Sequence, residues 1–174
     1  MEEESKKHFI LVHGTCHGAW YWYKLATLLR AAGHRVTVPD LAACGVHPKR
    51  LHELRSFSDY SEPLMEVISS IPSGEEVILV AHSFGGFTVA LAMEKFADKV
   101  SAAIFVTAMM PSTATPFSTI GQEFIMRHPP EHFMGTKVMI SQDHEINWRT
   151  ITFSPNHMKE RLYQLSKPGV TKLT

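Results

Sequence analysis

The stretch that most constrains this chain is residues 77–86, VILVAHSFGG. A run of apolar residues ends at Ser83 and a helical pattern follows at once, so we expect a buried strand, a sharp turn and a helix. Such a turn holds the serine hydroxyl clear of the sheet. The helix behind it directs backbone N–H groups and the positive end of its dipole toward that hydroxyl. Gly85 supplies one of the small residues that the turn needs, although Ala81 stands where glycine is usual. We therefore predict a nucleophilic serine; the alternative is a buried strand with a chance Gly-Gly.

Strand and helix patterns alternate through residue 110. Short apolar strands are expected over 9–12, 36–38 and 100–106, besides the strand before Ser83. Continuously apolar strands separated by helices are typical of a parallel sheet with helices on both faces. One helix is expected to start with the capping pair Ser56 and Asp59, and Pro63 is compatible with it only near its first turn.

The alternation stops after residue 110. Residues 111–166 combine a polar stretch, a short helix near 122–127, two hairpin strands over 137–141 and 148–153, and a helix over 156–166. We predict a core over 1–110, a lid over 111–166 that covers the carboxyl edge of the sheet, and an unstructured tail over 167–174.

Composition excludes several classes of function. The 174 residues carry a formal net charge of zero, which gives no support for a nucleic-acid partner or an acidic membrane surface. Cys16 and Cys44 are too few for a disulfide framework, and no Cys/His spacing fits a metal site. Without a signal-peptide pattern or a membrane-spanning apolar run, the default expectation is a cytoplasmic protein.

Several motifs resemble one family over most of the chain. They are residues 77–86 and, in addition, FILVHGTCHGAW at 9–20, PDLAACGV at 39–46, YSEPL at 60–64 and ERLYQL at 160–165. These motifs resemble plant α/β-hydrolases of the methylesterase and hydroxynitrile-lyase family. The resemblance implies an α/β-hydrolase fold and an esterase acting on small methyl esters, such as those of salicylate or jasmonate. It also implies that no cofactor is needed and that a homodimer can form.

The expected chemistry centres on Ser83. Its hydroxyl would attack the ester carbonyl and form an acyl-enzyme. The backbone N–H groups of Phe84 and Thr15 would form the oxyanion hole; the alternative for Thr15 is an ordinary loop residue. His13 and His82 are expected to be structural rather than catalytic bases, because a base must reach the serine hydroxyl within about 3 Å.

The substrate pocket is less defined by the sequence. His17 is expected near its mouth, or only as a residue that shapes the loop. Phe133, Met139 and Trp148 would line an apolar pocket if the lid closes over it, or else form the core of the lid itself.

Two positions favour an esterase over the lyases of the family. His82 stands where similar lyases have an acidic residue, and Gly14 stands where they have a threonine that binds the cyanohydrin. A hydroxynitrile lyase is kept as the less favoured alternative. A further alternative is a non-catalytic protein that binds a small ligand or a partner.

The partners of Ser83 are not evident in the sequence. In this fold the acid and then the histidine follow the nucleophile along the chain, each after a later core strand. The histidines after Ser83 all lie in lid-like sequence; they are His128, His132, His144 and His157. The pair Asp143-His144 is rejected as a relay because side chains of adjacent residues rarely point together. We expect a truncated chain that lacks the last two core strands, leaves the strand over 100–106 as an uncovered edge, and is weak or inactive alone.

Overall fold

The computed structural model describes residues 6–115, 117–140 and 149–166. Contacts divide the chain into two compact units, Met1–Ser112 and Thr113–Thr174. We call them the N-terminal and the C-terminal unit and describe each by itself.

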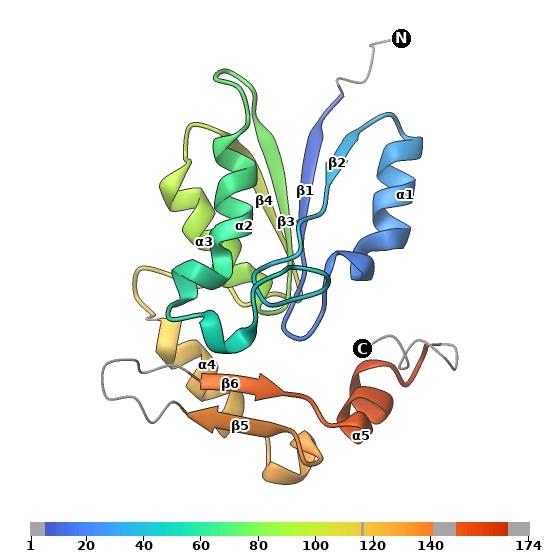
Figure 1. The fold of residues 1–174 in the computed structure, drawn as a ribbon, viewed down its shortest axis with the longest axis vertical. Helices are drawn as coiled ribbons and strands as arrows, with labels where there is room; N and C mark the ends of the chain where they lie inside the picture. The colour runs from blue at the N-terminus through green and yellow to red at the C-terminus, as the bar shows by residue number, and fades with distance from the viewer. Residues whose placement is uncertain (1–5, 116, 141–148, 167–174) are drawn as a thin grey trace. The chain divides into compact units, whose positions relative to one another are not determined.

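A parallel four-stranded sheet forms the centre of the N-terminal unit, in the order β2-β1-β3-β4 (Figure 1). Every neighbouring pair is parallel, as the continuously apolar strands predicted. The second strand begins one residue before the expected 36–38. The strands are β1 (His8–Val12), β2 (Arg35–Thr37), β3 (Val77–His82) and β4 (Val100–Val106).

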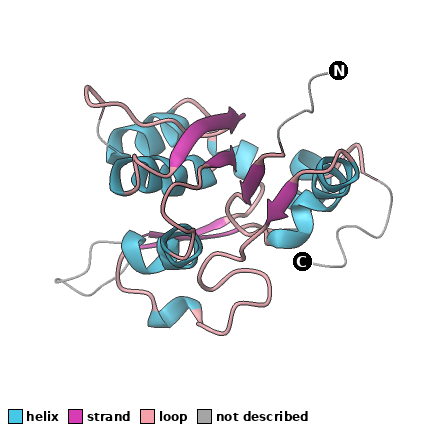
Figure 2. Cartoon of the chain, turned by 90° about the horizontal axis from the view of Figure 1, so that it is seen from above, coloured by secondary structure: helices cyan, strands magenta, loops and turns pink. Residues whose placement is uncertain are grey.

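Helices cover both faces of this sheet, as predicted (Figures 1 and 2). On one face, α1 (Tyr23–Ala31) and the short η1 (Ala19–Trp22) pack on Leu11. On the other face, α2 (Phe57–Ser69) and α3 (Gly85–Lys95) pack on the alternate residues of the same strands. The central strands β1 and β3 are therefore buried on both sides, which explains why their sequences are apolar without alternation. A short turn of helix, η2 (Leu51–Glu53), precedes α2.

The start of α2 confirms the predicted cap, whereas Pro63 corrects an expectation. Ser56 Oγ accepts from the Asp59 N–H at 3.1 Å, and Asp59 Oδ2 accepts from the Ser56 N–H at 3.1 Å. Pro63 lies in the interior of α2 rather than in its first turn. Its ring is buried in the packed side of the helix, and that burial offsets the hydrogen bond that a proline cannot donate.

In the described sheet β4 is an edge strand, as expected from the sequence. Ala103 and Phe105 pack on the core beneath α2 and α3. On the opposite face the side chains of Ile104 and Val106 are 47% and 41% exposed. Among the described residues no strand pairs with the outer edge of β4, and the face beside it presents apolar side chains.

The C-terminal unit contains the predicted hairpin, in which β5 (Lys137–Ile140) pairs antiparallel with β6 (Arg149–Thr152). Its first helix starts earlier than the expected 122. The remaining elements are α4 (Phe117–Met126), η3 (Pro130–Phe133), α5 (Pro155–His157) and η4 (Met158–Leu162).

Candidate active site

Ser83 occupies the turn between β3 and α3 in a left-handed backbone conformation, with φ of 52°. This conformation is costly for a residue with a side chain and persists only where the surroundings enforce it. The carbonyl oxygen of Ser83 accepts from the N–H of Gly86 at 3.2 Å and from that of Met109 at 2.9 Å. The turn is thus tied to α3 on one side and to the segment after β4 on the other.

Two glycines let the loop after β1 approach this turn. A Cβ built on Gly85 would lie 2.6 Å from the carbonyl oxygen of His13, and one on Gly14 would lie 2.9 Å from Ser83 Cβ. Both distances are too short for real carbon contacts, so these positions accept only glycine without a shift of backbone. The loop that carries Thr15 is therefore held directly against the serine.

His13 anchors that loop from within the core. Its fully buried ring accepts from the Leu41 N–H at Nε2 (3.0 Å) and donates from Nδ1 to the Gly14 carbonyl (2.9 Å). Burial lowers the pKa of His13, which keeps the ring neutral. With both nitrogens engaged in loop contacts, His13 has the structural role that we expected.

Four histidines of the N-terminal unit predict that its stability depends on pH. Burial lowers the pKa of His8, His13, His17 and His82 below the usual value of about 6.5. Below that pH the unfolded chain takes up protons that the folded chain resists, so the free energy of unfolding should fall as pH falls. Urea midpoints at pH 7.5 and 5.5 should show this loss, and His13→Gln should reduce it. The exposed His52→Gln should leave the pH dependence unchanged; the same dependence in His13→Gln as in the parent would contradict the assignment.

An aromatic cluster surrounds the residue before the nucleophile. The Tyr21 ring stacks on His82 with centroids 4.7 Å apart, and His17 meets Tyr21 edge-on at 4.9 Å. His17 is buried, and its Nδ1 donates to the Thr15 carbonyl at 2.7 Å. The structure thus brings His17 together with the Thr15 loop and the elbow; its contact with a substrate stays a prediction.

Sequence reasoning missed Asp40, which joins the Thr15 loop to the segment after β2. Its Oδ1 accepts from the Ala19 N–H at 2.6 Å and its Oδ2 from the Val46 N–H at 3.1 Å. A Cβ on Gly18 or on Gly45 would come within 2.7 Å or 2.0 Å of this carboxylate. The available signal was an aspartate three residues after the end of β2, with glycines in both neighbouring loops.

Removing this link should cost measurable stability. Asp40→Ala is expected to lower the free energy of unfolding by about 2 kcal/mol, because two N–H groups lose a charged acceptor and water replaces it only in part. Asp40→Asn keeps one acceptor oxygen, so its free energy of unfolding should fall by less than that of Asp40→Ala. Urea denaturation measures both against Asp98→Ala at an exposed position. A loss for Asp40→Ala no larger than for Asp98→Ala would show that the link is not stabilising.

The other predicted pocket residues belong to the second unit. Phe133 ends η3 and is half-buried, with its ring 5.5 Å from that of His132. Met139 lies in β5, and Trp148 is outside the described residues. Since each unit is described by itself, their contribution to a pocket stays a prediction.

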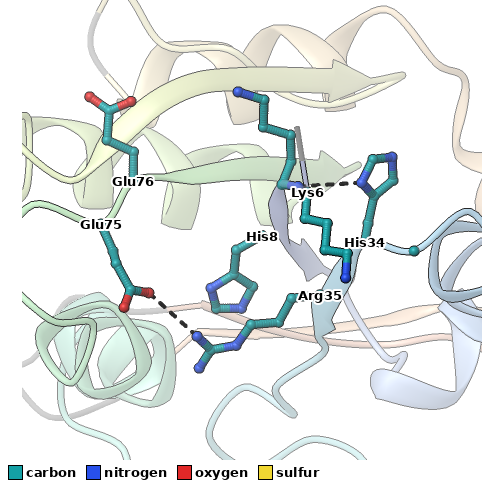
Figure 3. Close-up of a pocket in the computed structure, with 8 residues that line it drawn as sticks. Lys6, His8, His34, Arg35, Glu75 and Glu76 are labelled. Carbon is teal, nitrogen blue, oxygen red and sulfur yellow. Dashed lines mark hydrogen bonds and ion pairs between the residues drawn. The ribbon is translucent and has the colours of Figure 1, made fainter. Parts of the chain in front are cut away.

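A cavity of about 550 Å³ is lined by the residues drawn in Figure 3. It surrounds the starts of β1, β2 and β3, so it is not part of the serine site. In the part of the chain that the structure describes, no cluster of metal-ligating side chains occurs, and no helix has the length and apolarity to cross a bilayer. The cavity is lined by Lys6, Lys7, His8, Gly33, His34, Arg35, Glu75 and Glu76.

Comparison with known proteins agrees with this architecture. The family pattern described as alpha/beta hydrolase fold matches residues 7–129. Methyl jasmonate esterase 1 of Vitis vinifera is 49% identical over 166 residues, which cover 95% of this chain and 63% of that protein. Salicylic acid-binding protein 2 of Nicotiana tabacum is 44% identical over 162 residues, covering 93% and 62%.

Solved structures show the same likeness. The crystal structure of polyneuridine aldehyde esterase superposes with a TM-score of 0.90 at 41% identity, covering 97% of this chain and 66% of that one. The chain thus spans about two thirds of the length of the proteins that it matches. The chain belongs to the alpha/beta hydrolase fold family, and its relatives there are plant methylesterases and related esterases.

Proposed function

We propose that this chain carries the nucleophile of a carboxylic-ester hydrolase of the methylesterase type, with Ser83 as the attacking residue. The observation that carries the proposal is the strained turn of Ser83 between a buried strand and a helix, with Gly14 and Gly85 packed against it. The proposed substrates are small methyl esters, such as methyl jasmonate and methyl salicylate. Support for this class comes from the names of the relatives, which include a methyl jasmonate esterase and a salicylic acid-binding protein.

In the proposed reaction, Ser83 Oγ forms a bond to the ester carbonyl carbon as a base removes the hydroxyl proton. The N–H groups of Thr15 and Phe84 stabilise the resulting oxyanion. The C–O bond to the methoxy group then breaks, and methanol leaves with the proton that the base had taken. Water attacks the acyl-enzyme in the same manner, releasing the carboxylic acid and restoring Ser83.

The base and the acid remain to be assigned. Two of the described histidines that follow Ser83 make hydrogen bonds to nearby backbone. His128 Nδ1 is hydrogen-bonded to the Phe124 carbonyl at 2.8 Å, and His157 Nδ1 to the His132 carbonyl at 3.2 Å. These bonds favour local roles within the C-terminal unit. We therefore expect slow turnover by this chain alone, because a serine without its base is a poor nucleophile.

The C-terminal unit is proposed to act as the lid of this site. The proposed substrate pocket has His17 near its mouth and is lined by Phe133, Met139 and Trp148. A second candidate, a non-catalytic protein that binds the carboxylic acid, follows from the lack of an assigned base. The lyase alternative has less support, because Gly14 and His82 stand where the similar lyases have a threonine and an acidic residue.

Hydrolysis of a p-nitrophenyl ester tests the proposal. The chain should hydrolyse it slowly, and a fusion to the part of Methyl jasmonate esterase 1 outside the match should hydrolyse it and methyl jasmonate much faster. Full turnover by the chain alone, lost in Ser83→Ala, would contradict the expected dependence on additional residues. A folded fusion that binds salicylate or jasmonate but hydrolyses no ester would support the non-catalytic candidate instead.

A further inference from the structure

Three neighbouring strands contribute to the cavity of Figure 3. His8 begins β1, Arg35 begins β2, and Glu75 comes shortly before β3. These strands run parallel, and Ser83 follows the carboxyl end of β3. Because the starts and the ends of parallel strands lie at opposite edges of a sheet, a ligand in this cavity would not occupy the serine site.

His8 contributes a buried nitrogen that the described residues leave without a partner. The residue is 7% exposed, and its Nε2 is hydrogen-bonded to Thr37 Oγ1 at 2.8 Å. Its Nδ1 is also buried but has no hydrogen-bond partner within the described part of the chain. A buried polar atom that stays unpaired costs free energy. Since His8 lines the cavity and its ring lies beside the ion pair of Arg35 and Glu75 in Figure 3, a ligand bound there is the available partner.

The other nitrogen atoms around the cavity are mostly hydrogen-bond donors. The ammonium groups of Lys6 and Lys7 and the guanidinium of Arg35 cannot accept. His34 Nδ1 accepts from the Lys7 N–H at 3.3 Å, so the second nitrogen of the neutral ring carries the hydrogen. Arg35 Nη1 lies 3.5 Å from Glu75 Oε2, and both side chains are more than half exposed, so this pair can shift to admit a ligand. The cavity is therefore suited to a ligand that accepts hydrogen bonds.

Charge and volume narrow the class of ligand. With neutral histidines, the three cations Lys6, Lys7 and Arg35 exceed the carboxylates of Glu75 and Glu76 by one positive charge. One carboxylate group balances this surplus, whereas a phosphate monoester, with a charge of about −1.5 to −2 at neutral pH, exceeds it. The volume of about 550 Å³ is larger than a bare ion needs and lies in the range of cavities that hold small organic molecules.

We propose that this cavity binds a small organic acid through a single carboxylate group, with His8 Nδ1 and Arg35 as hydrogen-bond donors to its oxygens. Burial and the nearby charge of Arg35 lower the pKa of His8, so its ring is neutral in the free protein. When the Thr37 hydroxyl donates to Nε2, the hydrogen of that ring is on Nδ1 and needs an acceptor. The inference is independent of the proposed function, because none of the residues that line the cavity takes part in the reaction at Ser83.

Titration of the full, ¹⁵N-labelled chain with sodium benzoate at constant ionic strength tests the site. Benzamide, which is neutral and of similar shape, is the matched ligand. We expect saturable amide shifts in residues 7–9, 34–36 and 75–77 with benzoate and none with benzamide. His8→Phe keeps a ring but removes Nδ1, and Arg35→Gln removes the charge; each should weaken binding at least fivefold. Arg55→Gln, at an exposed position outside the cavity, should not.

The location and the charge dependence of the shifts decide the outcome. Saturable shifts at these residues that Arg35→Gln weakens and Arg55→Gln does not weaken support the site, even if His8→Phe fails to fold. Shifts confined to residues 13–17 and 82–86 would place benzoate at the serine and overturn the proposal. It is also overturned by equal weakening in the two arginine variants, by equal shifts with benzamide, or by no shift in a chain that is folded by circular dichroism. Tighter binding of inorganic phosphate than of benzoate would overturn the assignment to a carboxylate.

Discussion

Replacing Ser83 with alanine in the fusion to the unmatched part of Methyl jasmonate esterase 1 is expected to lower kcat by a factor on the order of 10⁴ to 10⁶. The acyl-enzyme cannot form without Oγ, and only the oxyanion hole and substrate binding remain to assist water. KM should change little, because the hydroxyl contributes to the reaction rather than to uniform binding of the ester. Steady-state hydrolysis of methyl jasmonate or of a p-nitrophenyl ester measures the effect.

The matched control is Ser73→Ala, at an exposed position between α2 and β3. It should leave both kcat and KM unchanged. A Ser83→Ala fusion that is folded and retains more than a tenth of the parent kcat would assign the reaction to another nucleophile.

Replacing Gly86 with alanine is expected to have the largest effect on the fold. Alanine in place of glycine inside a helix normally stabilises by about 1 kcal/mol. Here a Cβ would lie 1.9 Å from the Met109 carbonyl oxygen, which is backbone and has no rotamer by which to move away. Since Met109 also donates to the Ser83 carbonyl, displacing it would disturb the turn itself. We expect Gly86→Ala to lower the free energy of unfolding by about 3 kcal/mol.

Urea denaturation of Gly86→Ala and Gly74→Ala provides the comparison. A Cβ on Gly74 would meet no atom within 4 Å, but its φ of 84° is unfavourable for alanine. Its expected cost is therefore about 1 kcal/mol, from backbone conformation alone. Equal losses in the two variants would show that the close contact of Gly86 with Met109 is not a constraint.

The sequence predicted the central part of the fold because the signals there are local. Apolar runs such as Val77–His82 indicated strands buried on both faces, and the pair Ser56 and Asp59 indicated a helix start that the structure confirms. Pro63 was placed wrongly because tertiary burial overrides the preference of proline for the first turn of a helix.

The contacts that hold the Thr15 loop could not be predicted in the same way. Asp40 reaches Ala19 across 21 positions of sequence, and no local pattern specifies such a partner. The strain at Ser83 could be anticipated from the motif, but the tight approach of Gly14 and Gly86 depends on how separate segments pack. Long-range packing therefore sets the geometry around a nucleophile that local sequence had already indicated.

The most direct test of Ser83 as the nucleophile is labelling of the fusion with a fluorophosphonate, which modifies activated serines with release of fluoride. Peptide mapping by mass spectrometry should find a single phosphonyl adduct, on the peptide that contains Ser83, and none in the Ser83→Ala fusion. An adduct on another side chain that persists in Ser83→Ala, or an unlabelled Ser83 in a folded fusion that hydrolyses esters, would contradict the account.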